Sequence, residues 1–139
     1  MTKISQKIVF FGTENYSLAV LQKLVEAGIP IVYVVTKPDT RRGRGHKLIE
    51  PPVKIYAKKH NIPVLQPNKV SEIIDVITPI KPVVGILVAY GKIIPQSVID
   101  IFSPGIINVH PSLLPAYRDP SPIETAMTNL ETTDRKSVV

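Results

Sequence analysis

The first third of the chain alternates short apolar runs with a segment of helical periodicity. Residues 7–11 (KIVFF) and 31–35 (IVYVV) form apolar runs, the pattern of strands buried on both faces. Between them, residues 16–27 carry apolar side chains at helical spacing, namely Leu18, Leu21, Leu24 and Val25. Gly28 follows as a helix stop. A strand, a helix and a strand in this order predict a βαβ unit and therefore a parallel sheet.

The rest of the chain continues this alternation. We first expect a helix over 51–60 capped by Asn61 and an edge strand over 62–65. A helix over 71–78 should follow, started by Ser71 and Glu72 and ended before Pro79. The remaining expected elements are a strand over 82–91, a helix over 95–102, a strand over 106–110 and a helix over 122–129. The strand over 82–91 is the most apolar and should lie at the sheet centre. The fold class that follows is α/β, with a Rossmann-like, mostly parallel sheet and helices on both faces.

Composition restricts the class of protein further. The chain has 139 residues, of which 44% are hydrophobic and 20% charged, as expected for one globular domain. No apolar run approaches the roughly 20 residues of a membrane span, and no secretory signal is recognisable, so we expect a cytoplasmic protein. There is no cysteine, and His46, His60 and His110 lack the spacing of metal ligands. We therefore expect no metal.

The net charge of +6 is concentrated in one window. Its cations are Lys37, Arg41, Arg42, Arg44, Lys47, Lys54, Lys58 and Lys59. Only Asp39 and Glu50 oppose them there. Residues 36–48 combine glycines with guanidinium groups, which predicts a mobile surface loop. This loop is either a solvated surface segment or a clamp on a polyanion such as nucleic acid. Because aromatic residues are not interleaved with the cations, the second case implies phosphate contacts rather than base stacking.

A polar pair ends the strand over 106–110. Pro111 supplies no ladder donor, so the strand must stop at His110. Side chains alternate along a strand, which places Asn108 and His110 on one face. An amide can stabilise a developing oxyanion, and an imidazole can stabilise charge or carry a proton near pH 7. The alternative is that both are hydrogen-bonded structural residues. A phosphate site at the Gly12 turn is less favoured, because that turn lacks the G-x-G-x-x-G pattern.

Residues 108–115 (NVHPSLLP), followed by Tyr117, Arg118 and residues 120–124 (PSPIE), closely resemble the signature of the folate-dependent formyltransferases, in particular those that act on methionyl-tRNA. The resemblance implies 10-formyltetrahydrofolate as formyl donor and initiator methionyl-tRNA as acceptor, with no protein partner. It assigns catalysis to Asn108 and His110. It implies folate binding by Leu87, Val88, Ala89, Tyr90, Gly91, Ile94, Ser112, Leu113, Leu114 and Pro115, where apolar walls and free backbone groups would suit a flat ring. It implies tRNA binding by Arg41, Arg42, Arg44 and Lys47.

The sequence departs from the family pattern at several points. Glu14 stands where family members usually have proline, and Asp119 where they generally have glycine. The family also completes the Asn and His pair with a downstream aspartate, which Asp134 does not match in position or flanks. We also expect residues 1–139 to lack the C-terminal β-barrel domain that these enzymes use for tRNA. We therefore expect residues 1–139 to be part of a formyltransferase catalytic domain that is folded but nearly inactive by itself.

Two other interpretations remain at this point. The chain could belong to a formyltransferase for another amine, such as glycinamide ribonucleotide or an amino sugar nucleotide, which would use the same polar pair. It could also be a non-catalytic module that binds folate or nucleic acid. Steeply salt-dependent binding would favour tRNA, because it requires several phosphate contacts.

Overall fold

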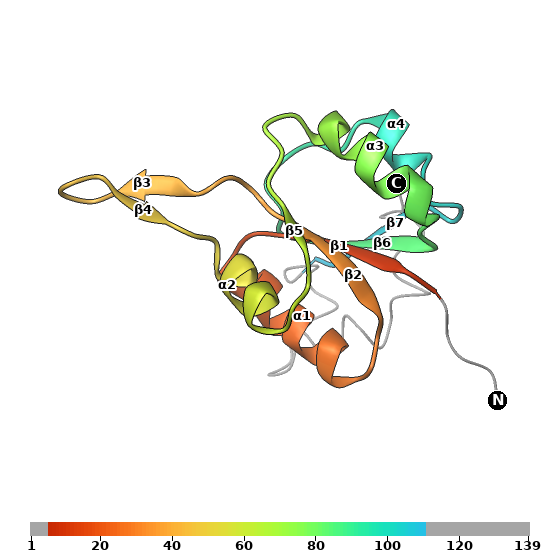
Figure 1. The fold of residues 1–139 in the computed structure, drawn as a ribbon, viewed down its shortest axis with the longest axis horizontal. Coiled ribbons are helices and arrows are strands. Elements are labelled where there is room, and N and C mark those ends of the chain that lie inside the picture. The colour runs from red at the N-terminus through yellow and green to blue at the C-terminus, as the bar shows by residue number, and fades with distance from the viewer. Residues whose placement is uncertain (1–5, 111–139) are drawn as a thin grey trace.

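A five-stranded parallel sheet forms the centre of the molecule (Figure 1). The computed structural model describes residues 6–110. The sheet order is β5-β2-β1-β6-β7. Its strands are β1 (Ile8–Gly12), β2 (Ile31–Val35), β5 (Val64–Leu65), β6 (Val84–Val88) and β7 (Ile106–Asn108). All four neighbouring pairs are parallel, so the predicted parallel sheet is confirmed, with β5 at its edge as expected.

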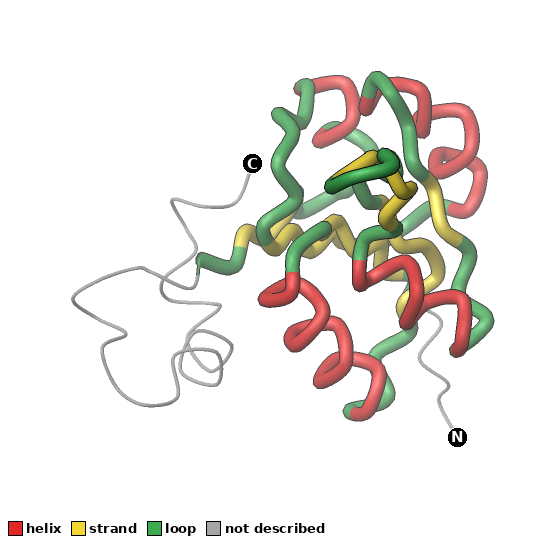
Figure 2. The backbone as a smooth tube through the Cα atoms, turned by 90° about the vertical axis from the view of Figure 1, so that its left-hand side faces the viewer, coloured by secondary structure: helices red, strands yellow, loops and turns green. Residues whose placement is uncertain are grey.

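Helices cover both faces of this sheet. They are α1 (Asn15–Glu26), α2 (Pro52–Lys59), α3 (Ile74–Ile77) and α4 (Gln96–Ile99), with 3₁₀ turns over Val70–Ile73 and Thr78–Ile80. Figure 2 shows the helices in two groups on either side of the strands. The predicted α/β class with helices on both faces is therefore confirmed.

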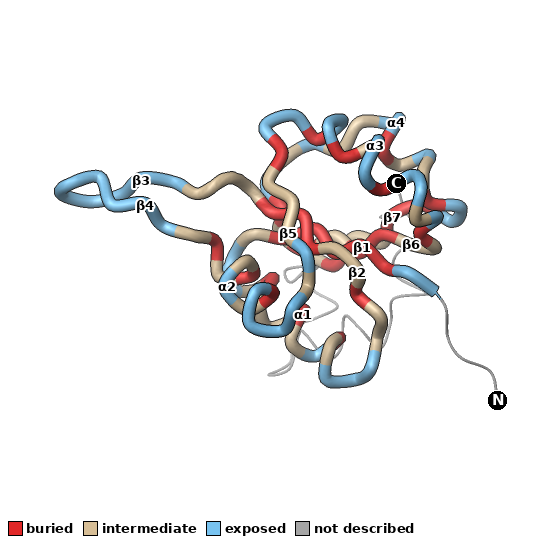
Figure 3. The backbone as a smooth tube through the Cα atoms, in the orientation of Figure 1, coloured by how far each residue is buried: buried red, intermediate tan, exposed pale blue. Residues whose placement is uncertain are grey.

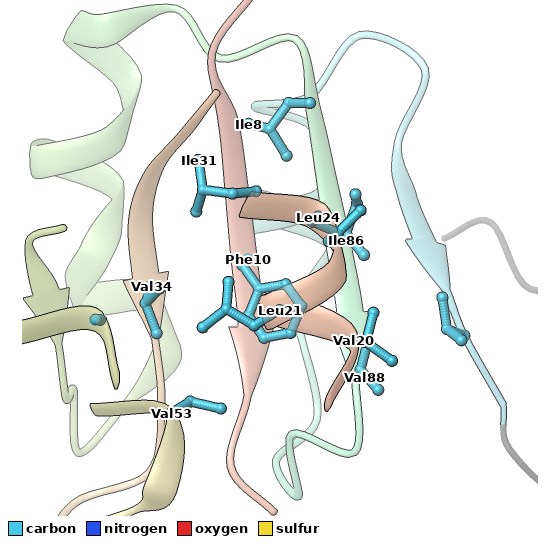
Figure 4. Packing of buried hydrophobic residues seen from close by; sticks show 12 residues of the cluster. Ile8, Phe10, Val20, Leu21, Leu24, Ile31, Val34, Val53, Ile86 and Val88 are labelled. Carbon is cyan, nitrogen blue, oxygen red and sulfur yellow. The ribbon is translucent and has the colours of Figure 1, made fainter. Parts of the chain in front are cut away.

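Two apolar layers result, one on each face. The first joins α1 and α2 to the sheet through residues that include Phe10, Leu21, Val34, Val53, Ile86 and Val88 (Figure 4). The second joins the segment 70–80 and α4 to the sheet through residues that include Val9, Phe11, Val35, Ile73, Tyr90, Phe102 and Ile106. Side chains alternate between the two layers, so every residue of β1 is buried.

Two expectations about the fold were wrong in detail. The middle strand of the five described is β1, not the apolar β6, which lies between β1 and β7. The segment around Ser71 begins as a 3₁₀ turn at Val70, and the Glu72 carboxylate accepts a hydrogen bond from the Asn68 amide at 3.2 Å. α3 does end before Pro79, as expected, and Pro79 lies in the 3₁₀ turn that follows, where a missing N–H costs little.

Most of the expected loop over 36–48 belongs to a regular hairpin. β3 (Thr40–Arg42) and β4 (Lys47–Ile49) pair antiparallel and form a hairpin that projects from the sheet beside α2 (Figure 1). All residues of both strands are exposed (Figure 3), so the surface location was predicted correctly. The turn between them needs left-handed backbone at Gly43 and Gly45, with φ of 72° and 80°, which glycine adopts without strain. The glycines therefore shape a tight hairpin turn.

Candidate active site at the carboxyl edge of the sheet

Asn108 ends β7 at the carboxyl edge of the sheet, where parallel α/β folds place their ligands. It lies opposite Leu87 in the register of β6 and β7. Both side chains are half-buried, and both point to the sheet face covered by α4, because Leu87 packs in that layer. Val109 continues the ladder by donating from its amide to the Leu87 carbonyl at 2.8 Å and buries its side chain on the opposite face. The predicted neighbourhood of these two strand ends is confirmed.

His110 follows two residues after Asn108, just beyond β7, and is half-buried. It is therefore close to the amide along the chain and accessible from the same edge of the sheet. The four expected folate contacts over 112–115 lie outside the described residues, as do Asp119 and the expected helix over 122–129.

Some side chains of the segment 87–94 lie in the apolar core, and others lie at the edge of the sheet. Val88 is buried against α1 in the opposite layer, so its side chain cannot face a ligand beside Asn108. Tyr90 is also in the core, with 1% of its surface exposed and its ring 5.7 Å from that of Phe11. Leu87 and Ile94 are half-buried apolar side chains at the margin of the layer that Asn108 faces. These two side chains fit an apolar wall for a flat ring.

The carbonyl groups of Val88, Ala89 and Tyr90 are not free, contrary to our expectation of free backbone groups. The Thr13 amide donates to the Ala89 carbonyl at 3.2 Å, and the Thr13 hydroxyl donates to the Tyr90 carbonyl at 2.7 Å. The Ser17 hydroxyl donates to the Val88 carbonyl. These bonds tie the turn after β6 to the turn after β1, with Ala89 and Gly91 at φ of 48° and 93°. They fix the backbone at the site instead of serving a ligand.

Gly12 allows this close approach. A Cβ atom at Gly12 would lie 2.7 Å from the Ser17 Cβ and 2.9 Å from the Val88 carbonyl oxygen. The Ser17 hydroxyl also accepts hydrogen bonds from the amides of Thr13 and Glu14, each at 3.1 Å, and so satisfies two donors at the start of α1. The glycine at this turn is thus needed for contact between backbone segments, not for phosphate binding.

Burial raises the pKa of the Tyr90 hydroxyl to about 12, because a phenolate in the apolar layer would be poorly solvated. Within the part of the chain that the structure describes, this hydroxyl has no hydrogen-bond partner. The side chain is therefore neutral at physiological pH and contributes through its ring.

The hairpin carries the four cations expected to bind tRNA. Arg41 and Arg42 lie on β3, Arg44 in the turn and Lys47 on β4. None of the four pairs with a carboxylate among residues 6–110. The Arg41 guanidinium instead donates to the His46 carbonyl at 3.1 Å across the turn. These charges remain available to an anionic partner.

A pocket of about 160 Å³ lies at the base of the hairpin. Thr13 and Asn15 line it from the start of α1, and Lys37, Arg42 and Glu50 line it from the hairpin side. Arg42 and its cross-strand partner Lys47 share one face of the ladder, while Arg41 lies on the other. The hairpin therefore presents positive charge both toward this pocket and away from it.

An ion-pair network at the base of the hairpin was missed by our sequence analysis. Lys54 and Lys58 belong to the cationic window that the sequence suggests for a polyanion, but the Lys54 ammonium lies 3.1 Å from Asp39 and 3.3 Å from Glu50. Lys58 lies 3.1 Å from Glu50. The spacing of Glu50 and Lys54 by four residues at a helix start is a signal that could have indicated one of these pairs. Asp39 offers no such signal.

Residues 6–110 contain neither a metal-binding cluster nor a membrane-spanning helix. No three His, Cys, Asp or Glu side chains gather there closely enough to hold a metal ion. No helix in that same part is both long and apolar enough to cross a membrane.

Comparison with known proteins identifies the class of protein that has this fold. The model of the formyl transferase family matches residues 6–135, and the chain belongs to that family. Among its relatives, the methionyl-tRNA formyltransferase of Geobacter sulfurreducens is 47% identical over 128 residues, which are 91% of this chain and 40% of that protein. The methionyl-tRNA formyltransferase of Sulfurihydrogenibium sp. is 45% identical over 124 residues, 87% of this chain and 40% of the relative. The chain thus spans about 40% of the length of these curated relatives.

Solved structures share the fold. The phosphoribosylglycinamide formyltransferase from Bacillus halodurans matches with a TM-score of 0.58 and 20% identity, over 88% of this chain and 65% of that one. A formyltetrahydrofolate deformylase from Pseudomonas syringae pv. tomato matches with a TM-score of 0.57 and 19% identity, over 89% of this chain and 42% of that one. At these identities the likeness shows the architecture alone.

Proposed function

We propose that this chain takes part in the transfer of a formyl group from 10-formyltetrahydrofolate to the amino group of initiator methionyl-tRNA, in the cytoplasm. The observation that carries the proposal is the 47% identity to a methionyl-tRNA formyltransferase over 91% of the chain. The exposed cations of the hairpin support an RNA acceptor, because they have no carboxylate partners in the described residues.

The folate supplies the formyl group, and residues of this chain hold it. Leu87 and Ile94 are the half-buried side chains that would pack against its flat ring. Asn108 lies beside Leu87 and would donate from its amide to the formyl oxygen, where negative charge develops as the amine attacks. Ser112, Leu113, Leu114 and Pro115 complete the folate contacts in this proposal.

His110 is the proton-handling group of the proposal. An imidazole two residues after Asn108 can take the proton that the attacking amine loses and return it to the leaving nitrogen of the folate. The half-burial of His110 leaves it accessible from the sheet edge while excluding part of the surrounding water. The hairpin residues Arg41, Arg42, Arg44 and Lys47 would hold the tRNA through its phosphates.

The test compares acceptors. The polypeptide is purified as its source cells make it and supplied with 10-formyltetrahydrofolate and either methionyl-tRNA, glycinamide ribonucleotide or an amino sugar nucleotide. We expect N-formylmethionyl-tRNA as the preferred product, and a loss of about a hundredfold or more in kcat for His110→Ala. Faster turnover of a nucleotide amine would contradict the proposed acceptor, and tight binding of tRNA and folate without turnover would favour a non-catalytic module.

A further inference from the structure

The two legs of the β3–β4 hairpin are joined at their base by a single ammonium group. Asp39 precedes β3 and Glu50 follows β4. The Lys54 Nζ donates to both carboxylate oxygens of Asp39 at 3.1 Å and lies 3.3 Å from Glu50. Lys54 belongs to the first turn of α2, which is packed on the sheet. Lys54 therefore contacts residues at both ends of the hairpin from the folded body.

Gln66 makes a second connection from the sheet. Its side-chain amide donates to Asp39 at 2.6 Å and to the Lys37 carbonyl at 3.1 Å. Gln66 directly follows the edge strand β5. The incoming leg of the hairpin is thus held between α2 and β5, and the outgoing leg is held by α2.

The ion pairs of Lys54 with Asp39 and Glu50 are partly shielded from water and fully ionised. The side chains of Lys54 and Asp39 are each 16% exposed and that of Glu50 is 33% exposed, so the group is screened from water more than a typical surface pair. Hydrogen bonding by Gln66, and then by Lys54, lowers the pKa of Asp39. Hydrogen bonds from Lys58 and Lys54 lower the pKa of Glu50. Both carboxylates are therefore ionised across the physiological range.

Beyond these contacts, the hairpin has little to hold it in place. Each residue of β3 and β4 is exposed, and within residues 6–110 the two strands pair only with each other. Arg42 nevertheless lines the pocket shared with Thr13 and Asn15, so its position depends on the angle at which the hairpin leaves the sheet. That angle is set where Asp39 and Glu50 meet Lys54.

We propose that Lys54 and Gln66 are positioning residues, which fix the orientation of the hairpin and so place its four cations for the phosphates of an RNA acceptor. The assignment of RNA rests on the proposed function, whereas the mechanical role of the two residues does not. Lys54 also neutralises Asp39 and Glu50, which would otherwise repel phosphates at the base of the hairpin.

Three substitutions separate position from charge. Gln66→Met removes both amide donors without changing the net charge. Lys54→Met removes the group that joins the two legs. Lys58→Met removes the same charge from the same helix but breaks only the contact with Glu50, and Lys58 is the more exposed side chain at 56%. Lys58→Met is therefore the matched control for the loss of a cation.

The first readout is hydrogen exchange of the hairpin amides, which requires no ligand. In Lys54→Met and Gln66→Met, exchange over residues 40–49 should accelerate about tenfold, as expected when charge-assisted hydrogen bonds that hold a segment are lost. Exchange in β1 and β6 should stay unchanged, and Lys54→Arg should restore the slower rate. Unchanged exchange in the hairpin of both variants would overturn the proposal.

The second readout separates KM from kcat in formyl transfer. Both variants should raise the KM for methionyl-tRNA by about tenfold, while kcat and the KM for the folate stay within about twofold, as for an ordinary surface change. Lys58→Met should alter all three by about twofold or less. Equal losses in Lys58→Met and Lys54→Met would reduce Lys54 to a simple phosphate contact and overturn its positioning role. If the unmodified protein forms no N-formylmethionyl-tRNA, the proposed function fails, and hydrogen exchange still decides the positioning role.

Discussion

Leu87 and Asn108 face each other across the parallel ladder of β6 and β7, and the amide that follows Asn108 donates to the Leu87 carbonyl at 2.8 Å. An apolar side chain and a neutral hydrogen-bond donor therefore lie side by side at the carboxyl edge of the sheet. This arrangement combines a surface for a flat ring with a group for a developing oxyanion, and the first prediction depends on it.

Replacement of Asn108 by aspartate should lower kcat by about a hundredfold to a thousandfold, the effect of removing one oxyanion donor in comparable sites. Aspartate keeps the shape of the side chain but can only accept hydrogen bonds when ionised. The KM for the folate should change little, because Leu87 and Ile94 remain. Steady-state kinetics at saturating methionyl-tRNA measures both values. Retention of kcat in Asn108→Asp would exclude the amide as an oxyanion donor.

Binding of tRNA should weaken steeply with salt, and each hairpin cation should contribute to that slope. Substituting Arg42 by alanine should reduce the slope of log K against log salt concentration by about 0.7–0.9, the contribution of one phosphate contact. Fluorescence anisotropy of labelled tRNA over a series of salt concentrations provides the slope. Lys7→Ala, at the opposite end of β1, loses the same charge and should leave the slope unchanged; an equal reduction there would indicate an unspecific field effect.

Replacing Gly12 by alanine should destabilise the fold by about 1–3 kcal/mol, as overpacking of a filled site does. The new Cβ would lie 2.9 Å from the Val88 carbonyl oxygen, a backbone atom that cannot turn away. Gly85→Ala is the matched comparison, because its nearest contact is a side-chain atom of Ile106 at 3.0 Å rather than a backbone atom. We expect Gly85→Ala to cost less than Gly12→Ala, near the lower end of the same range. Urea unfolding of both variants tests the order, and a larger loss for Gly85→Ala would contradict it.

Stability should fall as the pH rises from about 10 toward 12, in part through Tyr90. The pKa of this hydroxyl is about 12 in the folded protein and about 10 in an unfolded chain. Between these values the folded state binds more protons, so the free energy of unfolding decreases by up to about 1.4 kcal/mol per pH unit. Below the unfolded pKa, the contribution is fully present.

Tyr90→Phe isolates that contribution. The variant should show a weaker loss of stability between pH 10 and 12. At neutral pH it should be as stable as the unmodified protein or more stable by about 1 kcal/mol, because the buried hydroxyl has no partner in the described residues. Urea unfolding at several pH values gives the difference curve. Parallel curves for the two proteins would show that Tyr90 does not titrate in this range.

The sequence predicted the central βαβ unit because each of its elements is encoded by residues that are close together in the chain. The apolar runs of β1 and β2, the helical spacing in α1 and the stop at Gly28, whose φ is 82°, each occur within a few residues. The hairpin was missed although its pairs, Arg42 with Lys47 and Arg41 with Leu48, are also close in sequence. Its residues are exposed and mostly charged, so they do not produce the alternation by which half-buried strands are recognised.

The sequence predicted those parts of the site that depend on residues close together in the chain. The place of Asn108 followed from strand alternation and from the resemblance. The contacts of Asp39 with Gln66 and Lys54 span 27 and 15 residues, and no local pattern encodes them. The bonds that occupy the carbonyl groups after β6 are equally distant in sequence, because Thr13 is 77 residues from Tyr90.

The hydrogen bonds from Thr13 and Ser17 to the turn after β6 also affect how the chain folds during its synthesis. They join segments separated by 71 to 77 residues, and β1 has its neighbour β6 only when those residues have been synthesised. Such distant pairing is slow, because a long loop must close before the contacts form. On the ribosome, β1 and α1 must therefore wait with one side of β1 unpaired until Tyr90 has emerged, and the nascent chain depends during that interval on protection from aggregation.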